Sequence, residues 1–147
     1  MRYRTGIAAL ALAALAGPVA GCGAGSAVYD YGEVVEGGVG RSTEVEVAPG
    51  QRFSLAVEDN ASVGDSWKLG PLPDPKVASF ISAEYESEGG EDTTGGGGVR
   101  YFVFNAKQRG TTAVTLSNCW RCTAGRVPSD EQSRRLSGDA VFRITVK

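Results

Sequence analysis

The sequence predicts an all-β domain built as a β-sandwich or a β-barrel. Several short segments alternate between apolar and polar residues, so every second side chain would face the core of a sheet. Turn-forming pairs, such as Pro49-Gly50 and Arg109-Gly110, stand between these segments. No segment of helix length repeats its apolar residues at the helical period of about 3.6, which argues against a helical fold.

Six segments carry the strand pattern. The most regular one places Phe53, Leu55 and Val57 on one face, and the last one alternates in the same way up to Val146. The aromatic and β-branched run that begins at Tyr101 is strongly strand-prone. In chain order, the expected strands cover residues 44–47, 52–58, 77–82, 101–106, 111–116 and 141–146.

Three further segments complete the expected fold. Trp67 follows a polar loop at the start of a strand, where a sandwich commonly buries a large aromatic side chain. Residues 130–136 are short and highly charged, and the most they could form is a single helical turn. Residues 85–98 are polar, acidic and glycine-rich. We expect the acidic residues of 84–92 to form a solvated loop and not a pair of catalytic carboxylates.

The start of the chain is interpreted as an export signal. Arg2 and Arg4 precede an apolar run over residues 7–16, which is shorter than the about 20 residues that span a bilayer. The four residues that end at Cys22 resemble a bacterial lipobox, in which cleavage leaves this cysteine carrying lipid. An ordinary signal peptide, with Cys22 as a spare thiol, is the alternative. The expected organisation is a signal peptide over residues 1–21, a lipidated cysteine and flexible tether over residues 22–29, and one domain over residues 30–147.

This organisation predicts an extracytoplasmic protein that is anchored to the cell membrane by its lipid. Removal of the two leader arginines from the 15 basic residues leaves 13 against 17 acidic ones, a net charge of −4. Such an acidic domain argues against nucleic-acid binding, which demands a basic face. The chain has no histidine, the commonest metal ligand and the usual general base. We therefore expect a monomer with no cofactor, no metal site and no enzyme activity.

Three polar loops stand out because each follows or precedes a confident strand. They are the first loop, residues 60–67, the second loop, residues 89–98, and the third loop, residues 117–126. In their order and separations, and in the positions of Asn60, Gly64 and Trp67, they resemble the chagasin family of cysteine-peptidase inhibitors. The resemblance covers roughly residues 30–147.

The first loop resembles the Asn-Pro-Thr-Thr-Gly-aromatic-x-Trp loop of this family. Asn60, Gly64 and Trp67 match it in register, and the preceding strand aligns without gaps. The other positions differ: Ala61 replaces the proline, Ser62 and Val63 replace the threonines, and Asp65 replaces the aromatic residue.

The second loop fits the family pattern of a glycine-rich segment before a long strand, with Gly97-Gly98 before Tyr101. The third loop departs from the family's Arg-Pro-Trp. Here the chain reads Cys119-Trp120-Arg121-Cys122, so the arginine and tryptophan are in reversed order and the proline is absent.

The resemblance implies an immunoglobulin-like β-sandwich with three binding loops at one end. These loops would form a wedge that enters the cleft of a papain-like peptidase, and inhibition would be non-covalent and reversible. Ser62, Val63 and Gly64 would lie nearest the catalytic centre, while Trp120 or Arg121 would stand in for the family's aromatic anchor. Glycines in the second loop would let it approach the enzyme backbone closely. The implied contact residues are Asn60, Ala61, Ser62, Val63, Gly64, Asp65, Gly96, Gly97, Gly98, Trp120 and Arg121.

Cys119 and Cys122 leave three interpretations open. Outside the membrane, a structural disulfide that fixes the loop shape is the default. A redox Cys-x-x-Cys is the second, although such motifs need a helix N-terminus to lower the thiol pKa, and here the flanks are a strand and a turn. A pair of free thiols is the third. A zinc site is disfavoured, because two cysteines without histidine are too few ligands.

Three functions follow from these observations. The first is a membrane-tethered inhibitor of papain-like cysteine peptidases. The second is an envelope lipoprotein that keeps the chagasin-like domain but has lost inhibition, since the loop threonines are gone and Asp65 would be poorly placed in an apolar cleft. The third is a thiol–disulfide enzyme that uses Cys119 and Cys122.

Overall fold

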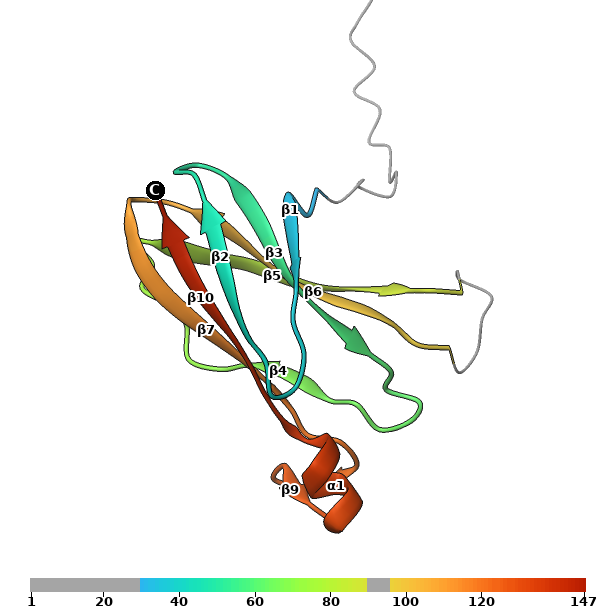
Figure 1. Cartoon of the computed structure of the whole chain (residues 1–147). Coiled ribbons are helices and arrows are strands. Elements are labelled where there is room, and N and C mark those ends of the chain that lie inside the picture. The colour runs from blue at the N-terminus through green and yellow to red at the C-terminus, as the bar shows by residue number, and fades with distance from the viewer. Residues whose placement is uncertain (1–29, 90–95) are drawn as a thin grey trace, which may run out of the picture.

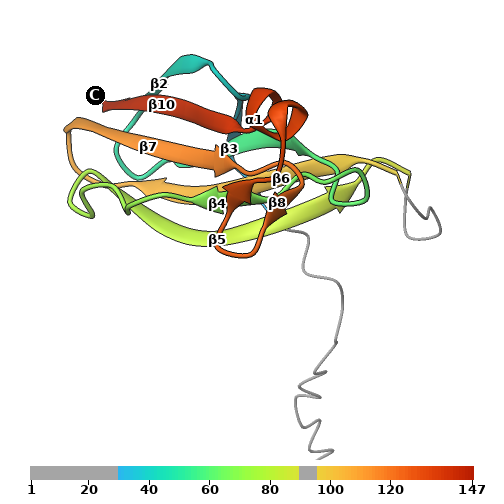
Figure 2. The ribbon, with the colours of Figure 1, turned by 90° about the horizontal axis from the view of Figure 1, so that it is seen from below.

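Two four-stranded sheets packed face to face make up most of the fold (Figures 1 and 2). The computed structural model describes residues 30–89 and 96–147. The first sheet has the order β1 (Glu33–Glu36), β3 (Arg52–Asp59), β6 (Gly98–Ala106) and β5 (Ala78–Ser87). The second has the order β2 (Ser42–Val47), β10 (Gly138–Val146), β7 (Gly110–Asn118) and β4 (Trp67–Leu69). A small hairpin of β8 (Cys122–Thr123) and β9 (Val127–Pro128) precedes the helix α1 (Glu131–Leu136).

Neither sheet closes on itself, so the fold is a sandwich and the barrel alternative is excluded. The alternating residues of the expected strands form the core between the sheets, as the sequence pattern predicts. Phe53, Phe104 and Phe142 are fully buried there, and the first two stack with ring centroids 5.5 Å apart. Burial of such side chains stabilises the sandwich by about 1.5–3 kcal/mol each.

All six expected strands are present, and Trp67 does begin a strand. β5 is longer than expected, because it runs through Tyr85 to Ser87 instead of ending near position 82. The interpretation of the first acidic residues of this segment as loop was therefore wrong; they lie on β5, paired with β6. The helical turn is confirmed as α1, which begins after Asp130, whose Oδ1 accepts the Ser133 N–H at 2.8 Å.

β1 was not predicted from the sequence. It has four residues without clear alternation, and it forms because it pairs in parallel with β3. The expected signal peptide, Cys22 and tether lie outside the described residues, as do residues 90–95 of the second loop. Within the described ranges, no helix is long and apolar enough to cross a membrane.

Candidate functional site

Strand register brings the three loops to one end of the sandwich. Asp59 at the end of β3 pairs with Gly98 at the start of β6, so the first loop begins beside the end of the second loop. Trp67 at the start of β4 pairs with Asn118 at the end of β7, so the first loop ends beside the third loop. The first loop is therefore the middle one, at the end of the molecule opposite the C-terminus (Figure 1).

Asn60 shapes the first loop. Its carbonyl oxygen accepts the backbone N–H groups of Val63, Gly64 and Asp65 at 3.1–3.2 Å, and its side-chain Oδ1 accepts the Ser62 N–H at 3.1 Å. Asn60 thus acts as a turn former, in the way that Asn commonly does. The tip that this turn presents to solvent consists of Ala61, Ser62 and Val63, which are all exposed.

The carboxylate of Asp65 faces into the protein. Its Oδ2 accepts the Asn60 N–H at 2.9 Å, which ties the two ends of the loop together, and its Oδ1 accepts from Asn118 Nδ2 at 2.9 Å. Asn118 in turn accepts the Ser66 N–H at 2.9 Å. Asp65 is therefore a structural residue, and the concern that its charge would enter an apolar cleft does not apply to this conformation.

Trp67 belongs to the core rather than to the binding surface. Its side chain is partly buried against the core cluster, and its indole Nε1 donates to the carbonyl oxygen of Glu58 at 2.9 Å. This bond joins β4 of one sheet to β3 of the other. The expectation of a core position at the start of a strand is confirmed.

An ion pair lies at the base of the first and second loops. Asp59 is only 2% exposed, and its Oδ2 accepts from Arg100 Nε at 2.5 Å. None of the described residues donates to its other oxygen, Oδ1. The guanidinium of Arg100 lies 5.5 Å from the centroid of the Tyr85 ring. The two loops thus share a buried charged support.

The glycines of the second loop have different roles. Gly98 is buried, and an added Cβ would overlap the Glu86 carbonyl oxygen and lie 2.6 Å from the Tyr85 ring. Its lack of a side chain therefore serves packing within the β5–β6 hairpin. The close approach to a peptidase that the resemblance implies for this glycine stays a prediction. Gly96 and Gly97 are half-buried, and Gly97 lies beside the Asn60 side chain.

The third loop is closed by a disulfide between Cys119 and Cys122, whose Cα atoms are 5.6 Å apart. Of the three interpretations of this pair, the structure has the disulfide. Cys119 follows the strand β7, so the helix N-terminus that a redox Cys-x-x-Cys needs is not beside it.

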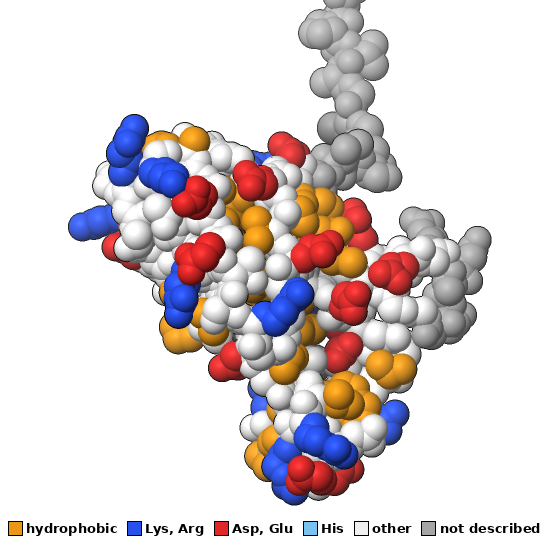
Figure 3. Space-filling view, viewed as in Figure 1, with side chains coloured by type: hydrophobic (Ala, Val, Ile, Leu, Met, Phe, Trp, Pro, Cys, Tyr) orange, Lys and Arg blue, Asp and Glu red, His pale blue; other side chains and the backbone are white. Residues whose placement is uncertain are grey.

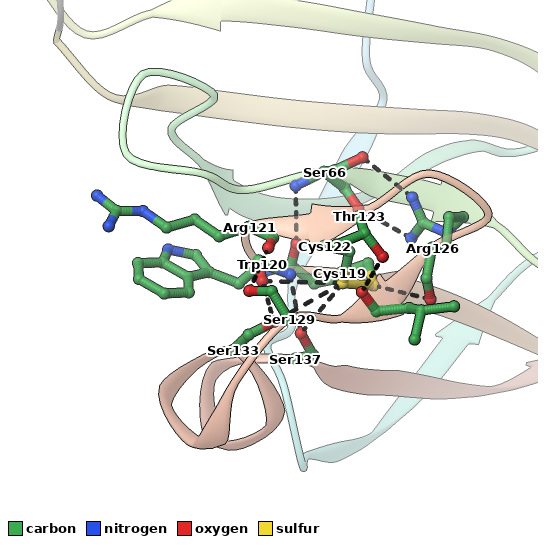
Figure 4. The surroundings of a disulfide bond; sticks show 12 residues. Ser66, Cys119, Trp120, Arg121, Cys122, Thr123, Arg126, Ser129, Ser133 and Ser137 are labelled. Atoms are coloured by element: carbon green, nitrogen blue, oxygen red, sulfur yellow. Dashed lines mark hydrogen bonds between the residues drawn. A yellow bond between two sulfur atoms is a disulfide. The ribbon is translucent and has the colours of Figure 1, made fainter.

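Arg121 and Trp120 take unequal positions in this loop (Figure 4). Trp120 is only 8% exposed, whereas Arg121 is exposed and its guanidinium lies 4.5 Å from the centroid of the Trp120 ring. Arg121 also donates from its backbone N–H to the Gly64 carbonyl and from its Nε to the Val63 carbonyl, both at 2.9 Å. Of the two residues that the resemblance offers as an anchor, Arg121 is thus the one exposed to solvent, and the Trp120 ring contacts its guanidinium.

Three serines hold the third loop in place, and the sequence analysis missed them. Ser129 and Ser133 donate to the carbonyl oxygens of Arg121 and Trp120 at 2.9 and 2.6 Å, and Ser137 accepts the Trp120 N–H at 2.8 Å. Figure 4 shows all three on one side of the disulfide-closed turn, below it in this view. Only Ser133 lies within α1, whereas Ser129 precedes the helix and Ser137 caps its end, so no sequence period marks the three as a set.

Ser133→Ala is expected to lower the free energy of unfolding by about 1–2 kcal/mol, because the hydroxyl is fully buried and its loss leaves the Trp120 carbonyl unpaired. Urea unfolding followed by circular dichroism measures the change. Ser129→Ala is the matched control, since this residue is exposed and water can replace its bond. Equal losses for the two variants would contradict the proposed support.

A hollow of about 740 Å³ lies behind the first and third loops. Its wall includes Val39, Trp67, Trp120 and Leu136, together with carboxylates and arginines. Figure 3 shows acidic side chains down the middle of this face and a mixed cluster of both charges over α1.

Residues 46–133, which contain the first loop and most of the third-loop support, match the family model described as chagasin family peptidase inhibitor I42. The chain belongs to this family. Chagasin family members are peptidase inhibitors and not enzymes, so the expectation of a non-enzyme is confirmed and the thiol–disulfide enzyme is set aside.

Solved structures of low sequence identity share the fold. The cysteine protease inhibitor EhICP2 from Entamoeba histolytica is 12% identical, with a TM-score of 0.51 over 78% of this chain and 95% of that chain. Amebosin is 14% identical, with a TM-score of 0.52 over 79% of this chain and 98% of that chain. PbICP-C, solved in complex with falcipain-2, is 16% identical, with a TM-score of 0.48 over 79% of this chain and all of that chain. The first two matches confirm the immunoglobulin-like sandwich. No curated protein matches the chain significantly.

Proposed function

We propose that the protein is a reversible, non-covalent inhibitor of papain-like cysteine peptidases, held at the outer face of the membrane by lipid on Cys22 and acting as a monomer. Membership of the chagasin family supports the inhibitory role. The observation that carries the proposal is the placement of the first loop between the other two, where strand register and hydrogen bonds from Arg121 hold it. An inhibitor that fills a cleft without being cleaved gains affinity when its loop is already held in the bound shape.

The exposed tip of the first loop suits an apolar cleft. Ala61, Ser62 and Val63 are small and uncharged, and the nearest carboxylate, Asp65, is turned inward onto Asn60 and Asn118. A tip without charge enters a cleft at a low desolvation cost.

Arg121 provides the anchor beside this tip. Its Nε is engaged by the Val63 carbonyl and its guanidinium is stacked on Trp120, so the side chain is already ordered before binding. No described carboxylate forms an ion pair with it, which leaves its terminal nitrogens for an acceptor on the peptidase wall.

Titration of the soluble domain, residues 28–147, against papain and a cathepsin L-type enzyme tests the proposal. We expect a progressive loss of peptidase activity that dilution reverses, with the inhibitor chain intact by mass spectrometry. Absence of inhibition at tens of micromolar rules out this enzyme class and favours the alternative, an envelope lipoprotein that has lost inhibition. Membrane fractionation of the full chain beside its Cys22→Ala variant tests the lipid anchor.

Val63→Asp is expected to raise the inhibition constant by about 30-fold, or about 2 kcal/mol, because it carries an unpaired carboxylate into the cleft. Leu72→Asp is the matched control. Both positions are exposed aliphatic side chains, at 45% and 67%, but Leu72 lies in the loop from β4 to β5 at the other end of β7. Inhibition titrations of the two variants should therefore differ, and equal constants would remove the tip of the first loop from the interface.

A further inference from the structure

The disulfide hairpin, residues 119–128, donates hydrogen bonds to the backbone of the first loop. The Cys119 N–H donates to the Ser66 carbonyl at 3.0 Å, while Arg121 donates to the carbonyls of Val63 and Gly64. Carbonyl groups of the first loop that have no partner within their own turn are thereby satisfied by the hairpin.

The Arg126 side chain, at the other end of the hairpin, makes a second set of hydrogen bonds to the first loop. One terminal nitrogen donates to Ser66 Oγ at 3.0 Å, and the other donates to the carbonyl oxygens of Ser66 and Ser117, both at 3.0 Å. This fork joins the end of the first loop to the end of β7 (Figure 4). The sequence analysis did not identify Arg126.

The disulfide closes the turn that contains Arg121. Arg121 and Arg126 both have left-handed backbones, with φ of 45° and 60°, which residues other than glycine keep only when the surrounding structure enforces them. Cys119 and Cys122 flank Arg121, so their covalent bond restricts the turn that enforces this conformation.

We propose that the disulfide hairpin is the positioning element of the first loop and that reduction of Cys119–Cys122 weakens peptidase inhibition. This inference rests on the proposed function. A dithiol supplies the chemistry: its thiolate attacks Cys122, the more exposed of the two cysteines, and the S–S bond breaks to a mixed disulfide. Its second thiol then displaces Cys122. Two electrons and two protons end on the two cysteine thiols, and the dithiol becomes a cyclic disulfide.

The first experiment measures inhibition in two redox states of residues 28–147. One sample stays oxidised, the other is reduced with dithiothreitol and alkylated, and both are titrated against papain that has been activated and then freed of small thiols. The inhibition constant should rise by about tenfold or more on reduction, because the loop must be ordered on binding. The Cys119→Ser/Cys122→Ser variant should have the inhibition constant of the reduced sample, and dithiothreitol should not change it. Equal constants for the oxidised and reduced samples overturn the proposal.

The second experiment follows the loop without a peptidase. Hydrogen exchange by NMR should become at least about tenfold faster on reduction at Val63, Gly64 and Asp65, while the core amides of Leu116 and Ile144 keep their rates. If the loop amides exchange faster on reduction but the oxidised domain does not inhibit papain, the proposed function is wrong. The positioning role of the disulfide hairpin is then still supported. Unchanged loop exchange, or equal acceleration in the core, overturns the positioning role.

A pair of variants tests whether the hydrogen bonds of Arg126, and not only its charge, hold the first loop. Arg126→Lys keeps the charge but cannot reach Ser66 and Ser117 together, so the same first-loop amides should exchange faster in the oxidised domain. Arg134→Lys is the control, because Arg134 is exposed and, among the described residues, forms its ion pair with Glu131 on α1. Equal exchange rates of the first-loop amides in the two variants would contradict a role of the Arg126 hydrogen bonds in holding this loop.

Discussion

Arg100→Met is expected to lower the free energy of unfolding by about 3 kcal/mol. The change leaves the Asp59 carboxylate, which is 2% exposed, without its cationic partner. Because no described residue donates to Asp59 Oδ1 either, the carboxylate would lose its only side-chain support in the described structure. Removal of one partner of a buried pair costs far more than removal of an exposed pair, since the remaining charge stays away from water.

Urea unfolding of the wild-type and variant domains measures this loss. Arg134→Met is the matched control, because its ion pair with Glu131 is exposed and should be worth less than about 0.5 kcal/mol. A double variant, Asp59→Asn with Arg100→Met, should recover part of the stability by removing the stranded charge. A loss for Arg100→Met no larger than that for Arg134→Met would show that the buried pair does not stabilise the sandwich.

The same ion pair links stability to the proposed site. Asp59 ends β3 just before the first loop, and Arg100 lies on β6 just after the second loop. Its loss should therefore loosen the relative position of the two loops as well as the fold. We expect the geometry of this pair to help fix which strand ends stand side by side.

Local patterns in the sequence predicted most of the strands. Alternation over six or more residues reflects burial on one face, so segments such as those around Phe53 and Phe142 could be identified without knowledge of their partners. The two-residue strands β8 and β9 are too short to show such a pattern, and β1 lacks it because its pairing depends on β3, elsewhere in the chain. The extension of β5 to Ser87 was missed for the same reason, since β6 supplies the hydrogen bonds that hold its acidic residues in a strand.

The candidate site also combines features that the local sequence predicts with features that depend on distant segments. The turn of Asn60 is local, and its residues matched a family pattern. The inward position of Asp65 depends on Asn118, 53 residues away, and the burial of Trp120 depends on Ser133 and Ser137. No periodicity in the sequence encodes contacts of this kind. The exposed or buried state of a loop side chain was therefore the least predictable property of the site.

Gly64→Ala should produce the largest loss of inhibition among single changes in the first loop, about 100-fold, or about 2.7 kcal/mol. Gly64 has a φ of 124°, which an L side chain rarely adopts. A Cβ there would also overlap Cγ of Arg121 and lie 3.2 Å from its backbone nitrogen. The bond from the Arg121 N–H to the Gly64 carbonyl would break, and both the tip and the anchor would move.

Gly50→Ala separates this effect from simple backbone strain. Gly50 has a φ of 82°, nothing lies within 4 Å of an added Cβ, and it donates to Ala106 at the end of the sandwich opposite the loops. Both alanine variants should therefore lose about 1–2 kcal/mol of folding stability from backbone strain, with more for Gly64→Ala. The inhibition constants from papain titration should differ between the two variants, because only the Gly64 change displaces Arg121. If both variants inhibit as well as the wild type, the contact between the first and third loops has no part in binding, whatever it contributes to the fold.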